Sequence, residues 1–118
     1  MPTKDEHIAK AERNAVFAKE LTLDSPARID WALISLFYSA VHYVEAYFAT
    51  LGTHLTTHKD RDSYISRDSY LRIIFKEYSN LKFFGFNARY EMMKFKAEDF
   101  NKCKPDFEKV KAHIRRKI

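Results

Sequence analysis

The chain has 118 residues, so we expect one domain over residues 1–118, and its 46% hydrophobic and 15% aromatic content excludes a disordered chain. Two Gly and three Pro are too few turn formers for a β-sandwich or barrel, and a single cysteine excludes an internal disulfide and a zinc site built on several cysteines. Residues 1–58 contain five Lys/Arg and seven Asp/Glu, whereas residues 59–118 contain sixteen Lys/Arg and nine Asp/Glu. The basic second half is compatible with binding to RNA, DNA or an acidic protein, and equally with a solvent-exposed, lysine-rich helix surface that binds nothing.

The first predicted element is a helix over residues 5–21, with apolar positions at helical spacing. Its opening stretch, MPTKDEHIAKAERN, has no apolar core, so we expect no signal peptide and a location in the reducing cytoplasm. The helix stops at LTLDSP. Asp24 or Ser25 is a suitable N-cap there, and Pro26 suits the first position of the next helix.

The second predicted helix is apolar almost all round from Trp31 to Leu51. Its length raises the question of a membrane span, but it contains His42, Glu45, three Tyr and two Ser and has no basic flank, so we expect no insertion. A helix of this kind is buried on two sides, and we expect one side to pack within the domain and another to form a homodimer. One stripe of it is small or polar and lets another helix approach closely: Ala32, Ser35, Ser39, His42, Ala46 and Ala49. Gly52 follows as a C′ residue.

A polar segment, HLTTHKDRDSYISRDSYLR, follows over residues 54–72. Thr57 with Asp60 resembles a helix start, and the phrase SRDS predicts a restart into a second helix. His54 and His58 are spaced four apart, as a zinc site on one helix face requires. The threonines around His54 place it in the loop before the helix, however, so we expect no metal site and no cofactor.

A long helix is predicted from Leu71 onward, because apolar residues keep helical phase without a slip. The positions are Leu71, Ile74, Tyr78, Leu81, Gly85, Ala88 and Met92. Gly85 falls on the buried stripe, which predicts a close-packing point inside the helix; the alternative is a break at FFGFN. Although a helical glycine costs about 1 kcal/mol, the phase favours continuation.

The last predicted helix keeps its phase through Pro105, so we expect it to continue there, and a new helix that starts at Pro105 is the alternative. Its buried stripe is Phe100, Cys103, Phe107, Val110 and Ile114. Cys103 is therefore a structural thiol in this interpretation. With short connections and no strand signal, the chain predicts an all-α, up-and-down antiparallel bundle of four to five helices.

The candidate functional residues are His42, His58, Arg61, Arg89 and Tyr90. His42 lies inside the most apolar helix, where an imidazole needs a hydrogen-bond partner. His58 and Arg61 are three apart, and are therefore neighbours on the short helix. If the helices bring this set together, arginine can bind phosphate through two hydrogen bonds and histidine can act as acid or base.

The same set can instead be a buried polar network that fixes how the helices cross. Arg89 would then pair with Glu45 or Asp62, and its removal would lower stability and change no activity. No Gly-Xaa-Ser-Xaa-Gly elbow and no phosphate-binding glycine loop occurs in the sequence, since it holds two glycines in all. The sequence therefore allows two interpretations of these residues: a site for ligand binding or acid–base catalysis, and a buried network that only stabilises the fold.

The stretches DWALISLFYSAVHYVEAYFA, HKDRDSYI and YSNLKFFGFNARYE together resemble the HEPN-like domain family (higher eukaryote and prokaryote nucleotide-binding), over about residues 26–116. The corresponding features are His42 in the second helix, His58 with Arg61 after the loop, and Ala88-Arg89-Tyr90 at the end of a long helix. The resemblance implies an antiparallel helical bundle, often a homodimer, in a setting of RNA cleavage, toxin–antitoxin pairs, mobile-element conflict or nucleotide binding. Ribonuclease members carry an arginine followed, after four to six residues, by a histidine, and this sequence lacks that pair.

From the residues and the resemblance together, we expect a binding module whose polar cleft holds RNA, a nucleotide or a cognate protein partner. Arg61, Arg89 and Tyr90 would contact the ligand. One alternative is a degenerate, metal-independent ribonuclease toxin that uses His42 and His58 as an acid–base pair. The other is a purely structural or interaction domain without activity.

Overall fold

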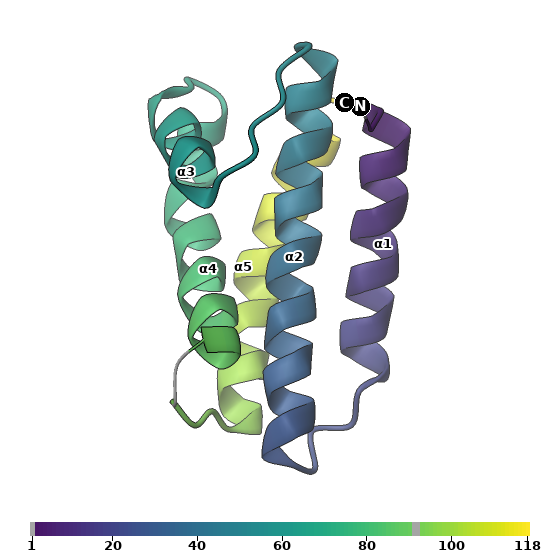
Figure 1. Cartoon of the computed structure of the whole chain (residues 1–118), viewed down its shortest axis with the longest axis vertical. Helices are drawn as coiled ribbons and strands as arrows, with labels where there is room; N and C mark the ends of the chain where they lie inside the picture. The colour runs from purple at the N-terminus through teal and green to yellow at the C-terminus, as the bar shows by residue number, and fades with distance from the viewer. Residues whose placement is uncertain (1, 91–92) are drawn as a thin grey trace.

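The computed structural model describes residues 2–90 and 93–118, and in those ranges it contains helices and no strand. The α-helices are α1 (Lys4–Glu20), α2 (Pro26–Thr50), α3 (His58–Arg67), α4 (Phe75–Tyr90) and α5 (Ala97–Arg115), with a 3₁₀ turn, η1 (Leu71–Ile74), before α4. The long helices α1, α2, α4 and α5 run alternately in opposite directions, and the short α3 lies near one end of the bundle (Figure 1). The predicted all-α, up-and-down antiparallel bundle is confirmed. None of the helices in the described ranges combines the length and the hydrophobicity that a membrane span requires.

Local chemistry sets the ends of α2 where the sequence predicted them. Ser25 is its N-cap and Pro26 stands in its first turn. At the other end, Leu51 is the C-cap and Gly52 has a φ of +68°, in the left-handed region that glycine enters without steric cost. The backbone N–H of Gly52 donates to the carbonyl oxygen of Ala49 over 3.2 Å, which closes the last turn.

The polar segment after α2 forms the predicted short helix α3, but the long helix predicted from Leu71 begins with the 3₁₀ turn η1, and α4 itself starts at Phe75. Thr57 is the N-cap of α3, and its hydroxyl accepts a hydrogen bond of 3.1 Å from the backbone of Asp60. The carboxylate of Asp68 accepts hydrogen bonds from the backbone N–H groups of Tyr70 and Leu71, and this starts η1. His54 lies in the irregular segment before α3, as predicted.

The centre of the bundle is α2, which packs against α1, α4 and α5. The hydroxyl of Ser39 donates a hydrogen bond of 2.7 Å to the carbonyl oxygen of Ala11, so α1 approaches the small-residue stripe of α2 closely. Ala11 and Ala18 are the buried apolar residues of α1, and His7 is its buried polar residue. The stripe therefore admits another helix, as predicted, and that helix belongs to the same chain.

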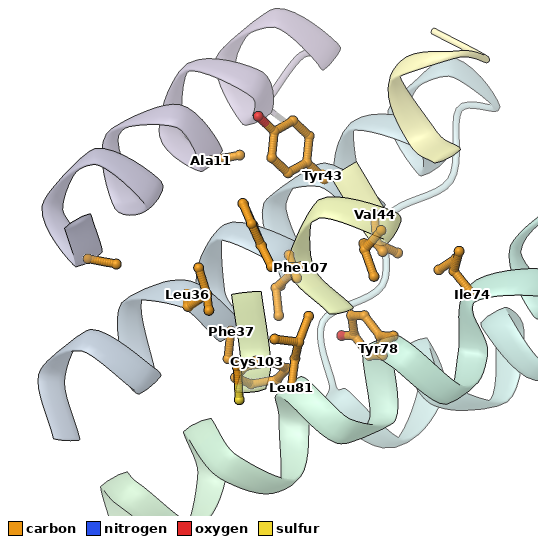
Figure 2. Packing of buried hydrophobic residues seen from close by; sticks show 14 of the residues in the cluster. Ala11, Leu36, Phe37, Tyr43, Val44, Ile74, Tyr78, Leu81, Cys103 and Phe107 are labelled. Carbon is orange, nitrogen blue, oxygen red and sulfur yellow. The ribbon is translucent and has the colours of Figure 1, made fainter. Parts of the chain in front are cut away.

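The hydrophobic core surrounds α2 and lies between it and α1, α4 and α5, with buried aromatic rings and aliphatic side chains packed together (Figure 2). Gly85 is buried within α4, and a Cβ atom there would lie 2.5 Å from Cβ of Phe37 on α2. It is therefore a close-packing point and α4 does not break at it. The final helix runs through Pro105 without a new start. The predicted continuation of the helix at Gly85 and at Pro105 is confirmed in both places. Met92, the last residue of the predicted stripe, lies outside the described residues.

The thiol of Cys103 is part of this core. It is 1% exposed, and burial raises its pKa to about 12, so it stays protonated at neutral pH. We expect iodoacetamide to leave the folded protein unmodified at mildly alkaline pH and to alkylate one thiol after unfolding in guanidinium chloride, as measured by intact mass. Rapid alkylation without denaturant would contradict a structural thiol at this position.

Candidate functional site

Two adjoining hollows lie along the side of α2 that α5 leaves uncovered. The first, which we call the histidine hollow, has a volume of about 410 Å³ and is lined by α1, α2, the segment after α2 and α3. The second, which we call the Trp31 hollow, has a volume of about 340 Å³ and is lined by α1, α2 and α4. Tyr38 and His42 line both of them, so the two hollows adjoin at these two side chains of α2.

The histidine hollow collects four of the five histidines of the chain: His7, His42, His54 and His58. Arg61 and Glu45 complete its polar lining. The structure thus brings His42, His58 and Arg61 together, and it adds His7, which the sequence analysis missed. A signal was present, because His7 precedes the buried Ala11 by four residues and so lies on the inner face of α1.

His42 finds its hydrogen-bond partner in His7. Their Nδ1 atoms are 3.0 Å apart and their ring centroids 5.3 Å apart. Burial lowers the pKa of His42 to about 4, and burial is also the main cause of the lowered pKa of His7. Both rings are therefore neutral at pH 7, and one Nδ1–H donates to the other Nδ1.

Arg61 is engaged from several sides. Its Nε donates to Oε1 of Glu45 over 2.6 Å, Nη1 donates to Nδ1 of His58 over 2.9 Å, and Nη2 donates to the carbonyl oxygen of Leu55 over 3.3 Å. Arg61 and Glu45 are each 6% exposed. The charge of this guanidinium is compensated by a buried carboxylate, and it ties α3 and the preceding loop to α2. The geometry therefore favours a structural role for Arg61 over the predicted contact with a ligand.

His58 is held in one tautomer by this contact. A guanidinium has only donors, so Nδ1 of His58 must accept and Nε2 must carry the proton. Burial, followed by the neighbouring charge of Arg61, lowers the pKa of His58, which keeps the ring neutral. A ring in this state has no free lone pair with which to take up a proton. The hydrogen bonding therefore disfavours His58 as a general base.

Arg89 lies in the Trp31 hollow and not in the histidine hollow. Its Nη1 donates to the hydroxyl of Tyr38 over 2.5 Å, and its guanidinium carbon lies 4.8 Å from the ring centroid of Tyr90. The pairing of Arg89 with Glu45 or Asp62 is wrong, because Arg61 takes Glu45 and Lys82 takes Asp62. Tyr90 is 54% exposed and supports Arg89 from outside the hollow.

The rest of the Trp31 hollow combines cationic, aromatic and amide groups. Lys10 and Asn14 come from α1, and Trp31 from α2 is 57% exposed. Within residues 2–90 and 93–118, neither Lys10 nor Arg89 has a carboxylate within 4.0 Å. In this part of the chain their charges differ from that of Arg61, which is paired with a buried carboxylate.

The chain matches no protein-family model, and comparisons with curated proteins and with solved structures found no match. The resemblance to the HEPN-like family therefore depends on the sequence motifs quoted above. The histidine hollow presents imidazoles, and the Trp31 hollow presents cations that have no carboxylate partner among the described residues, beside exposed aromatic rings.

Proposed function

We propose that the chain is a HEPN-like binding module that holds a segment of single-stranded RNA in the Trp31 hollow. The observation that carries this proposal is the position of Arg89, a cation without a carboxylate partner among the described residues, beside Tyr38 and the exposed ring of Trp31. Proteins that bind single strands combine a basic groove with aromatic side chains on which bases stack. Arg89 and Lys10 would contact phosphates, and Trp31 would stack on a base.

The amide of Asn14 and the hydroxyl of Ser35 add uncharged hydrogen-bond groups to the same hollow. Such groups can contact the edge of an unstacked base or a 2′-hydroxyl. A homodimer through α2, as the sequence predicts, would cover this same side, because most of the remaining surface of α2 is buried within the chain. It is therefore an alternative to RNA in the Trp31 hollow, whereas a cognate partner in a toxin–antitoxin or mobile-element setting stays part of the proposal.

Trp31 is the only tryptophan of the chain, so its fluorescence reports directly on this hollow. We expect a single-stranded oligoribonucleotide to quench it, with an apparent affinity that falls steeply as salt rises. Arg89→Gln should weaken RNA binding by about tenfold, the size of one stacking or charge-assisted contact. Anisotropy of a fluorescein-labelled oligoribonucleotide measures the affinity, and should show a similar loss for Trp31→Ala.

The matched control is Arg72→Gln, which removes the same charge from an exposed position on η1. It should change the affinity little. An equal loss in both arginine variants would show that RNA is attracted by net charge alone and would refute the assigned site. Quenching by a mononucleotide but not by RNA would identify a nucleotide ligand, and no quenching by either would favour the purely structural domain.

A further inference from the structure

The histidine hollow has a chemistry of its own that RNA binding does not use. His7 of α1, His42 of α2, His54 of the loop and His58 of α3 line the same space. Imidazole nitrogens are ligands that Zn²⁺, Cu²⁺ and Ni²⁺ prefer, whereas Ca²⁺ and Mg²⁺ prefer oxygen. Three helices and one loop therefore bring imidazole ligands to the histidine hollow.

The His7–His42 pair has the spacing of two ligands of one metal ion. Their Nδ1 atoms are 3.0 Å apart. Two nitrogens that each lie about 2.0–2.1 Å from a metal are separated by about 3 Å when the angle at the metal is near 90–100°. The cation would take the place of the proton between the two Nδ1 atoms, and that proton would move to Nε2 of the same ring, so that each neutral ring binds through Nδ1.

Further ligands have to come from outside this pair. Across the described ranges, no three His, Cys, Asp or Glu side chains already stand in a metal-binding arrangement. His58 is turned to Arg61 by its Nδ1. His54 lies on an irregular segment that lines the same hollow, so a small movement of that segment or water molecules can supply the remaining positions.

We propose that His7 and His42 bind a divalent transition-metal cation through their Nδ1 atoms, with His54 or water completing its coordination. Such a cation would bridge α1 and α2 and so stabilise the folded chain through mass action. This inference does not rest on RNA binding, since Arg89 and Trp31 lie in the other hollow.

The experiment is calorimetric titration of the full chain, stripped with chelator, with Zn²⁺, Cu²⁺ and Ni²⁺ at neutral pH and with Mg²⁺ for comparison. We expect one equivalent of at least one transition cation to bind, no heat from Mg²⁺, and a rise of the melting temperature with that cation. His7→Gln and His42→Gln should each weaken binding by about tenfold or more, because each removes one of two protein nitrogens. Bound Cu²⁺ should show nitrogen coupling in its electron paramagnetic resonance spectrum.

His113→Gln is the matched control, because His113 is the one histidine outside the hollow and its ring bonds to the carbonyl oxygen of Tyr70. It should bind the cation as the unmodified chain does. Circular dichroism checks the fold of each variant, and His7→Gln, near the exposed start of α1, serves if His42→Gln unfolds. The absence of binding by all three cations would overturn the proposal, as would binding that survives both variants or that is lost equally in His113→Gln.

Discussion

Replacing Arg61 by alanine is expected to lower the free energy of unfolding by about 3–5 kcal/mol, the usual cost of removing one partner from a buried ion pair. Arg61 and Glu45 are each 6% exposed, and their Nε and Oε1 atoms are 2.6 Å apart. Alanine would leave a carboxylate in the interior without its cation and would remove the hydrogen bonds to His58 and Leu55. Urea unfolding followed by far-ultraviolet circular dichroism measures the loss as a lower midpoint at an unchanged slope.

Two comparisons separate the buried charge from the size of the side chain. Arg89→Ala removes an exposed guanidinium and should cost about 0–1 kcal/mol, as exposed charged contacts do. The double variant Glu45→Leu with Arg61→Met removes both charges and should be more stable than either single variant, because no uncompensated ion remains inside. An unfolding midpoint of Arg61→Ala equal to that of the unmodified chain would show that the pair does not hold α3 on α2.

The helices could be predicted because the information for them is local. Pro26, Gly52 and Thr57 mark helix ends through backbone chemistry that depends on a few neighbouring residues. At Gly85 and Pro105 the residue type favours a break and the hydrophobic phase favours continuation, and continuation is correct in both places. Buried apolar area along a whole stripe outweighs the backbone cost of one unsuited residue.

The site was less predictable, because its interactions join residues that are distant in sequence. Glu45 and Arg61 are 16 residues apart and His7 and His42 are 35 apart, so no local pattern pairs them. Sequence reasoning treated Arg61 and Arg89 alike as phosphate contacts. The structure buries the first against a carboxylate and leaves the second exposed, and that distinction depends on where α3 and α4 pack.

Replacing Gly85 is expected to force α4 away from α2. An added Cβ would lie 2.5 Å from Cβ of Phe37 and 3.0 Å from two of its ring carbons. Because Cβ of Phe37 is bonded to the backbone of α2, no rotamer change relieves the contact. Overpacking of this kind costs about 1–3 kcal/mol or more, against about 1 kcal/mol gained from the better helix propensity of alanine. Gly85→Ala should therefore lower the unfolding free energy, and Gly85→Val should lower it further.

The other glycine supplies the control, since Gly52 has a φ of +68° and open space around it. Asparagine tolerates the left-handed region, so Gly52→Asn should be close to neutral, whereas Gly85→Asn should be as damaging as valine. Phe37→Leu should not rescue Gly85→Ala, because leucine keeps the Cβ atom that makes the shortest contact. Urea midpoints rank the variants. If Gly85→Ala is instead more stable by the full helix propensity of alanine, α2 and α4 do not touch at this point. The packing that places Arg89 of α4 and Trp31 of α2 in the same Trp31 hollow would then be wrong.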